Sequence, residues 1–189
     1  IVTPYYNKPT QEGLYQHYKK INDNVGIPII IYNIPSRSVI DMSVETMTKL
    51  YELKNITGVK DATGDLKRVE LQKKYMGNEF VQLTGNDDNA LEFNKLGGIG
   101  AIGVTANIAA KLSSDFQKAC IEDKDKAVEL NKILQPLHAA MFIESNPSPV
   151  KYAASLLNMC EQTVRLPLVE VKDTNKKKIS EALKVAKLL

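Results

Sequence analysis

Pro28-Ile29-Ile30-Ile31-Tyr32 is the stretch that decides the fold, because this apolar run has turn residues on both sides. A short run rich in β-branched residues predicts a strand that is buried on both faces. Similar runs occupy residues 56–60, 80–84 and 101–105, and helical patterns separate the runs at about 10–24, 43–53, 65–76 and 87–96. Candidate N-cap residues for three of these helices are Thr10, Ser43 and Asp65. Strands that alternate with helices predict a parallel sheet, so we expect an α/β fold.

The number of strands decides which parallel architecture is expected. If residues 1–3 end a strand, the chain holds five strands up to Thr105, each followed by a helix. This pattern fits a (β/α)8 TIM barrel, which needs eight such units and about 250 residues. We therefore expect residues 1–123 to form the C-terminal five units of a barrel, with three units missing before Ile1. Helical patterns at about 124–141, 149–158 and 174–188 predict a C-terminal helical domain over residues 124–189.

A doubly wound nucleotide-binding sheet is the structural alternative. Against it, no GxGxxG motif follows any of the strands. The glycine cluster at 97–100 lies between a helix and a strand, where it is better explained as a helix C-cap and a turn.

The composition excludes several classes of protein. Hydrophobic residues make up 43% of the chain and charged residues 25%, which is typical of a globular domain. The net charge of +3 comes from lysines spread among acids, and the run at 176–178 is expected at a solvated helix start, so nucleic-acid binding is disfavoured. Cys120 and Cys160 lack a CxxC motif and metal-ligand spacing, so we expect buried free thiols in a reducing cytoplasm and no metal site. No apolar run reaches the roughly 20 residues of a membrane helix.

The C-terminal ends of the strands are the places to look for an active site, because a barrel builds its site there. Lys60 closes an apolar strand, where burial lowers the pKa of an amine and leaves more of it neutral and nucleophilic. On position alone, a lysine that extends to solvent or pairs with Asp61 explains Lys60 equally well. Tyr32 is similarly either a packed aromatic residue or a proton shuttle. Arg37, one of three arginines in a lysine-rich chain, suggests bidentate recognition of a carboxylate.

Five segments carry a resemblance that covers the whole chain in order: Val2-Thr3-Pro4-Tyr5-Tyr6-Asn7-Lys8-Pro9-Thr10-Gln11, Tyr32-Asn33-Ile34-Pro35-Ser36-Arg37, Gly58-Val59-Lys60-Asp61-Ala62-Thr63-Gly64, Gly100-Ala101-Ile102-Gly103-Val104-Thr105-Ala106-Asn107 and Asn146-Pro147-Ser148-Pro149-Val150-Lys151. They resemble signatures of the dihydrodipicolinate synthase family, within the superfamily of pyruvate-dependent class I aldolases. The resemblance implies a (β/α)8 barrel that condenses pyruvate with aspartate semialdehyde to 4-hydroxy-tetrahydrodipicolinate, in diaminopimelate and lysine biosynthesis. It also implies a cytoplasmic homotetramer, built as a dimer of dimers, that needs no metal or organic cofactor.

The same resemblance implies roles for individual residues. Lys60 matches the amine that forms a Schiff base with pyruvate, and Tyr32 matches the hydroxyl that passes protons over it. Tyr6 resembles the tyrosine that completes a proton relay from a neighbouring subunit. Arg37 matches the arginine that helps to hold the carboxylate of aspartate semialdehyde. Two further matches are Ile102, whose backbone carbonyl would line the pyruvate site, and Tyr5, which would lie at the inhibitor cleft of lysine-regulated members.

Three departures from the family pattern qualify this expectation. Ser38-Val39 replaces the usual Thr-Gly after Arg37, and because valine adopts a positive φ only at a cost, the loop is expected to differ in shape. Asn86-Asp87 stands where an acidic pair is common. The Gly-Thr-Thr-Gly-Glu segment, which supplies the relay threonine and backbone donors for the pyruvate carboxylate, is not in this sequence.

Two other functions stay open at this point. An N-acetylneuraminate lyase or sugar-acid aldolase would use the same tyrosine and lysine on other aldehydes, although Arg37 and the segment at 146–149 favour the synthase. A non-catalytic barrel protein that acts as a binding module would form no covalent adduct with pyruvate at Lys60.

Overall fold

The computed structural model describes all residues from Ile1 to Leu189. The chain divides into two compact units, Ile1–Ile102 and Gly103–Leu189. The domain boundary that we expect at residue 123 is drawn differently, because it assigns the helix that follows the fifth strand to the barrel. That boundary stays a prediction.

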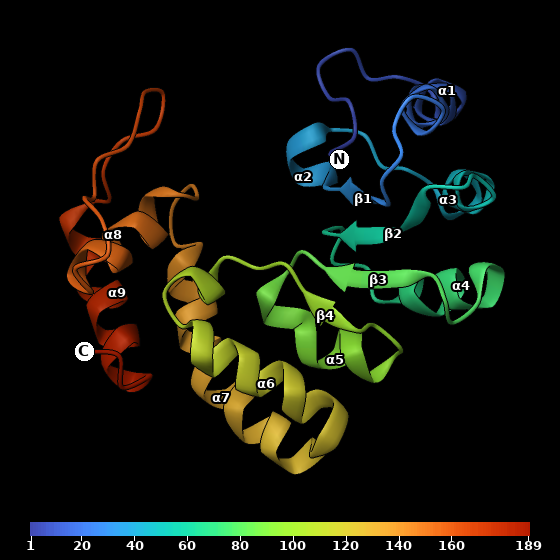
Figure 1. The fold of residues 1–189 in the computed structure, drawn as a ribbon. Helices are drawn as coiled ribbons and strands as arrows, with labels where there is room; N and C mark the ends of the chain where they lie inside the picture. Colours follow the sequence, from blue (N-terminus) through green and yellow to red (C-terminus); the bar gives the residue numbers. More distant parts are fainter. The chain divides into compact units, whose positions relative to one another are not determined.

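The first unit contains a sheet of four parallel strands in the order β1-β2-β3-β4 (Figure 1). The strands are β1 (Ile29–Asn33), β2 (Ile56–Asp61), β3 (Val81–Thr84) and β4 (Gly100–Ala101). Val2 adds an isolated parallel bridge to Tyr32, where Thr3 N donates to the Tyr32 carbonyl over 3.1 Å. The predicted parallel α/β fold is therefore confirmed, and residues 1–3 pair beside the first full strand.

The helices of the first unit follow the strands as expected. They are α1 (Gln11–Asn22), α2 (Pro35–Ser38), α3 (Val44–Tyr51), α4 (Lys67–Met76), η1 (Asp87–Asn89) and α5 (Ala90–Lys95). Thr10 and Ser43 are confirmed as N-cap residues, because their side chains accept from Gly13 N and Thr46 N. Asp65 is wrong as an N-cap: Leu66 holds that position, and the Asp65 carboxylate accepts from Lys67 N in a turn before the helix.

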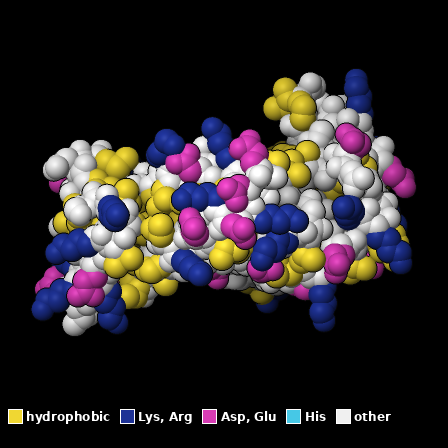
Figure 2. All heavy atoms as spheres, turned by 90° about the horizontal axis from the view of Figure 1, so that it is seen from below, with side chains coloured by type: hydrophobic (Ala, Val, Ile, Leu, Met, Phe, Trp, Pro, Cys, Tyr) yellow, Lys and Arg dark blue, Asp and Glu magenta, His cyan; other side chains and the backbone are white.

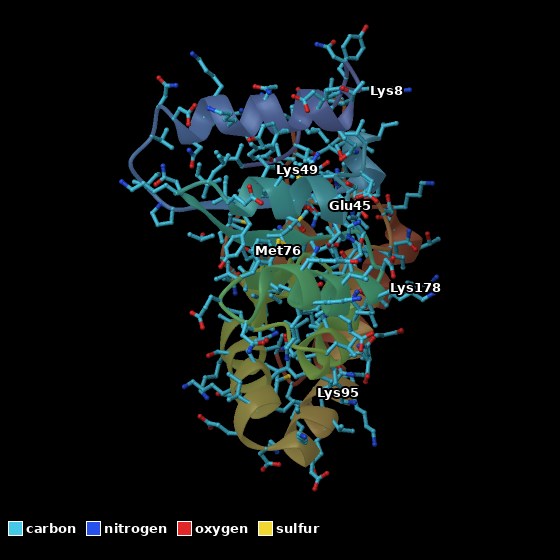
Figure 3. All side chains as sticks on the ribbon, turned by 90° about the vertical axis from the view of Figure 1, so that its right-hand side faces the viewer. Lys8, Glu45, Lys49, Met76, Lys95 and Lys178 are labelled. Atoms are coloured by element: carbon cyan, nitrogen blue, oxygen red, sulfur yellow. The ribbon has the colours of Figure 1, made fainter.

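The core of the first unit lies between β1, β2 and the helices that Figure 1 draws along one side of the strands. Its members are Leu14, Tyr18, Ile29, Ile31, Met42, Met47, Leu50, Ile56, Val59, Met76 and Phe80. Met76, labelled in Figure 3, packs at the end of α4. In β1 the residues alternate between buried and half-buried within this chain: the helices cover the face of Ile29, Ile31 and Asn33, and Tyr32 lies on the other face.

The second unit is helical, as expected for the C-terminal part of the chain. Its helices are η2 (Thr105–Asn107), α6 (Ala110–Glu122), α7 (Lys124–Met141), α8 (Ser148–Leu156) and α9 (Asp173–Val185). The predicted range 124–141 is confirmed, and Asp123 caps this helix by accepting from Lys126 N. Leu134, Leu137, Met141, Ile179 and Leu183 are its fully buried large side chains.

Two expectations on this part of the chain are wrong. The strand predicted over 101–105 ends at Ala101, because Thr105 starts a 3-10 turn in which its carbonyl accepts from Ile108 N over 3.1 Å. The strand propensity of this β-branched segment is outweighed by the turn and by a buried 2.8 Å hydrogen bond between Thr105 Oγ1 and His138 Nδ1. The cysteines are free thiols but are not buried: Cys120 is half-buried and Cys160 is exposed.

The surface agrees with a solvated protein of mixed charge. On the face that Figure 2 shows, positive and negative side chains are interspersed, and lysines extend from α3, α5 and α9 in Figure 3. None of the helices combines the length and the apolar character needed to cross a membrane.

Candidate active site

Lys60 and Tyr32 lie side by side at the ends of neighbouring strands. They are register partners in the parallel pair β1 and β2, and the Lys60 Nζ lies 4.0 Å from the centroid of the Tyr32 ring. Both side chains are half-buried on the face of the sheet opposite the helix-covered core. The structure thus brings together the two residues that the sequence singles out at strand ends.

A register shift in the sheet produces this pairing. Ile29 pairs with Ile56, but Ile30 pairs with Gly58, so one extra residue of β2 is accommodated at this point. Without the shift, Tyr32 would pair with Val59, and Lys60 would point toward the helices, since a one-residue slip moves side chains to the other face. On the other side of β2, Gly58 permits the close approach of β3, because a Cβ there would lie 2.2 Å from the Val81 carbonyl oxygen. Irregularities of this kind commonly redirect a side chain beside an active site.

The surroundings of Lys60 favour a nucleophilic amine. Burial lowers the pKa of Lys60, and the negative charge of Asp87 opposes this effect to a smaller degree. A larger fraction of the amine is therefore neutral at a given pH than for an exposed lysine. Asp87 is buried at the start of η1, directly after β3.

The surroundings of Tyr32 keep its phenol protonated. Burial raises the pKa of the Tyr32 hydroxyl, and the nearby positive charge of Arg37 opposes the rise. A phenol that holds its proton beside an amine can donate that proton as a reaction proceeds. The opposite directions of the two pKa shifts suit a neutral amine next to an acid.

Asp61 does not pair with Lys60, because its side chain lies on the opposite face of β2. It is 5% exposed, and its Oδ2 accepts from Arg68 Nε over 2.9 Å. Thr63 binds the other carboxylate oxygen through its Oγ1 at 2.6 Å and its N at 2.9 Å. The alternative in which Lys60 is only the ion-pair partner of Asp61 is therefore wrong.

Gly85 makes room for the Lys60 side chain. It follows β3, and its N donates to the Asp61 carbonyl over 2.7 Å. A Cβ at this position would lie 3.0 Å from Lys60 Cε and 2.7 Å from the Cβ of Ala62. Both separations are shorter than an ordinary carbon contact of about 3.5–4.0 Å. Only glycine fits here without displacing its neighbours.

The other candidate residues surround this pair at different distances. Arg37 is exposed in the single turn of α2, close enough to Tyr32 for its charge to affect the hydroxyl. Ile102 continues the ladder after β4, since its N donates to the Thr84 carbonyl over 2.9 Å. Tyr5 and Tyr6 lie in the turn after the first bridge and are 63% and 88% exposed. Within this chain the structure does not bring Tyr6 to Tyr32 and Lys60.

Val39 adopts the left-handed conformation, with φ 66 and ψ −12, directly after α2. The sequence departs from the family pattern at this position, where glycine is usual. Val39 takes the backbone conformation that favours glycine despite the cost to a β-branched residue, and its N donates to the Pro35 carbonyl to close the turn that holds Arg37. The difference in loop shape from the family stays a prediction.

Sequence reasoning missed the supporting residues Gly85, Asp87 and Arg68. Gly85 and Asp87 were visible as part of a strand end, but nothing in the residue types showed that they pack around Lys60. Arg68 carried the same signal as Arg37, since it is another of the three arginines in the chain.

Comparison with known proteins identifies the family of this chain. The sequence profile of the dihydrodipicolinate synthetase family matches residues 1–186. The chain is 72% identical over 193 residues to the 4-hydroxy-tetrahydrodipicolinate synthase of Pelagibacter ubique and 55% identical over 190 residues to that of Afipia carboxidovorans, and it covers 66% and 64% of their lengths. All of this chain is covered in both comparisons. The chain therefore spans about two thirds of the length of the curated relatives.

Solved structures give the same result for the fold. The crystal structure of dihydrodipicolinate synthase from Acinetobacter baumannii, complexed with pyruvate, matches with a TM-score of 0.96 and 43% identity. The enzyme from Aquifex aeolicus matches with the same two values, and in both cases the match covers 100% of this chain and 65% of the other. The profile match, the identities to the relatives and the solved structures agree, and the chain belongs to the dihydrodipicolinate synthetase family.

Proposed function

We propose that this chain carries the Schiff-base lysine and the proton-transferring tyrosine of a 4-hydroxy-tetrahydrodipicolinate synthase. The observation that carries the proposal is the Lys60 amine, 4.0 Å above the Tyr32 ring at the ends of two parallel strands. Family membership and the names of the relatives support this reaction over an N-acetylneuraminate lyase or a binding module.

The first half of the reaction forms an enamine on Lys60. The neutral amine attacks the ketone carbon of pyruvate, and loss of water gives a protonated imine. The cationic nitrogen withdraws electrons from the neighbouring methyl group, so that removal of one proton gives the enamine. Tyr32 is the acid and base for these transfers, a role worth about 10² to 10⁴ in rate. The chemistry calls for no metal or organic cofactor, because Lys60 itself provides the electron sink.

The second half joins the two substrates. The enamine carbon adds to the aldehyde carbon of aspartate semialdehyde, and the amine of that substrate then attacks the imine carbon. Ring closure expels Lys60 and gives 4-hydroxy-tetrahydrodipicolinate. Arg37 holds the carboxylate of aspartate semialdehyde through its guanidinium group, and the carbonyl of Ile102 lines the pyruvate site. The position of Arg37, close enough to Tyr32 to affect its hydroxyl, supports this role.

The exposed tyrosines belong to a larger assembly in this proposal. Tyr6, 88% exposed here, completes a proton relay with Tyr32 in a neighbouring subunit of a homotetramer. Tyr5 lines an inhibitor cleft if lysine regulates the enzyme. Residues 1–123 are the C-terminal units of a barrel, residues 124–189 are its helical domain, and the enzyme works in the cytoplasm.

Borohydride trapping tests the proposal directly. The full-length protein is incubated with labelled pyruvate and borohydride, and the labelled peptide is identified by mass spectrometry. We expect label on Lys60, loss of label and of condensation in Lys60→Ala, and normal labelling in the control Lys49→Ala, an exposed lysine of α3. Label on another lysine, or none, contradicts the mechanism.

A further inference from the structure

A buried polar network lies on the helix-covered face of the sheet, directly behind the two reactive residues. It includes Asn33 and Asp61, which follow Tyr32 and Lys60 in their strands and point to the other face. Asn33 is fully buried and Asp61 is 5% exposed. Asn33 and Asp61 are therefore the last residues of β1 and β2, and a displacement of either one also moves the preceding side chain, Tyr32 or Lys60, in the site.

Arg68 on α4 connects the two strand ends. Its Nε donates to Asp61 Oδ2 over 2.9 Å, and its Nη2 donates to the Met42 carbonyl over 2.8 Å. The segment at Met42 is in turn fixed to β1, because Met42 N donates to Asn33 Oδ1 over 3.1 Å and Asn33 Nδ2 donates to Asp41 Oδ1 over 2.7 Å. Arg68 thus reaches Lys60's strand through one arm and Tyr32's strand through the other.

We propose that Arg68 is a positioning residue, which sets the separation of Lys60 and Tyr32 by holding the ends of β2 and β1 from behind. This inference rests on the proposed function, since it deepens the account of the same site. Arg68 touches no substrate, because it lies on the opposite face of the sheet and is 8% exposed. Its effect reaches the reaction only through the two strands.

The geometry of the contacts explains why an arginine is needed. Two nitrogens of one rigid guanidinium group bind a carboxylate and a backbone carbonyl at the same time, and a third, Nη1, lies 3.5 Å from Asp41 Oδ2. A lysine keeps the charge but offers a single, flexible ammonium group. Arg68→Lys should therefore keep Asp61 paired with a cation while releasing the link to Met42.

The test uses Arg68→Lys in the full-length protein, with Arg165→Lys as the matched control at an exposed arginine. Imine trapping at saturating pyruvate separates two quantities, the rate constant and the fraction of protein that is labelled. We expect Arg68→Lys to lower the rate constant at least tenfold, since small displacements of reacting groups strongly slow a reaction. The labelled fraction and the half-saturating pyruvate concentration should change less than about threefold. The control should match the parent protein in all three.

A second readout is independent of pyruvate. Reductive methylation with formaldehyde and cyanoborohydride, which supplies the hydride, measures the reactivity of Lys60 against pH. The charges that face the site are Asp87 after β3 and Arg37 beside Tyr32. Displacement of the strand end should shift the midpoint of Lys60 labelling in Arg68→Lys but not in Arg165→Lys. If Arg68→Lys leaves the rate constant of imine trapping unchanged and lowers only the labelled fraction, its role is purely structural and the inference is overturned. An unchanged pH midpoint of Lys60 methylation would also overturn it. If the parent protein traps no pyruvate, the proposed function fails, and the midpoint still decides the positioning role.

Discussion

The narrow space around Lys60 makes Gly85→Ala a sharp test of the site. The added Cβ would lie 2.7 Å from the Ala62 Cβ and 3.0 Å from Lys60 Cε. Relative to an ordinary contact of about 3.5–4.0 Å, the overlaps are about 0.8–1.3 Å and about 0.5–1.0 Å. Ala62 is held by its N–H, which donates to the Asn33 carbonyl over 2.8 Å, so the first overlap should cost about 1–3 kcal/mol of stability.

The second overlap affects the reaction more than the fold. The Lys60 side chain can rotate away from the new methyl group, but this displaces the amine from the Tyr32 ring. A displacement of about 1 Å at a reacting group is enough to slow a reaction on the order of 10²-fold. We therefore expect Gly85→Ala to lower both the midpoint of urea unfolding and the rate constant of imine trapping.

Two companion variants separate these effects. Gly26→Ala is the matched control, because nothing lies within 4 Å of its added Cβ, and it should leave stability unchanged or raise it by up to about 1 kcal/mol. Adding Ala62→Gly to Gly85→Ala removes only the first overlap, so stability should recover in part while trapping stays slow. If Gly85→Ala unfolds and traps like Gly26→Ala, the packing of Lys60 against Gly85 is refuted.

Three further outcomes follow from the site. Arg37→Ala should raise the KM for aspartate semialdehyde by roughly 10- to 150-fold, which corresponds to about 1.5–3 kcal/mol for a lost charged hydrogen bond, and equal effects on both KM values would contradict this role. Val39→Gly should raise the free energy of unfolding in urea by up to about 1.5 kcal/mol, because relief of roughly 1–2 kcal/mol of backbone strain exceeds the cost of the added freedom of the unfolded chain. Val39→Ala retains the strain and should not show this gain. The initial rate of imine trapping should rise with pH and level off below pH 10.5, because the neutral amine is the reactive form and burial lowers the pKa of Lys60 from its usual value of 10.5. A midpoint at pH 10.5 or above would argue against this effect of burial.

The regular elements were predictable because local signals and tertiary packing agree there. The apolar run at 28–32 forms β1 with a one-residue offset, and the pattern at 124–141 matches α7 at both ends. The predictions failed where a turn outweighed propensity. Thr105 continues a β-branched segment, yet its hydrogen bond to His138 and the turn to Ile108 end the strand early. Such long-range partners leave no mark on a local pattern.

The candidate site was predictable as a set of residue types but not as a geometry. Strand ends supplied Lys60 and Tyr32, and the family resemblance supplied their roles. Counting alternate residues from buried Ile56, however, would point Lys60 toward the helices, because strict alternation gives residues 56, 58 and 60 the same face. The shift that pairs Ile30 with Gly58 reverses this, and it involves the pairing of β2 with another strand, which a pattern within β2 does not show.

Arg68 shows the same limit from the other side of the sheet. Arginine is rare in this lysine-rich chain, so Arg68 was as conspicuous in the sequence as Arg37. Only residues at strand ends, however, were expected to carry function. The structure gives the reason for an arginine on α4: two nitrogens must reach Asp61 and the Met42 carbonyl together, from behind the strands. In this proposal the site has two layers of residues, one that faces the substrate and one that holds the strand ends from behind, and only the first is visible as a motif.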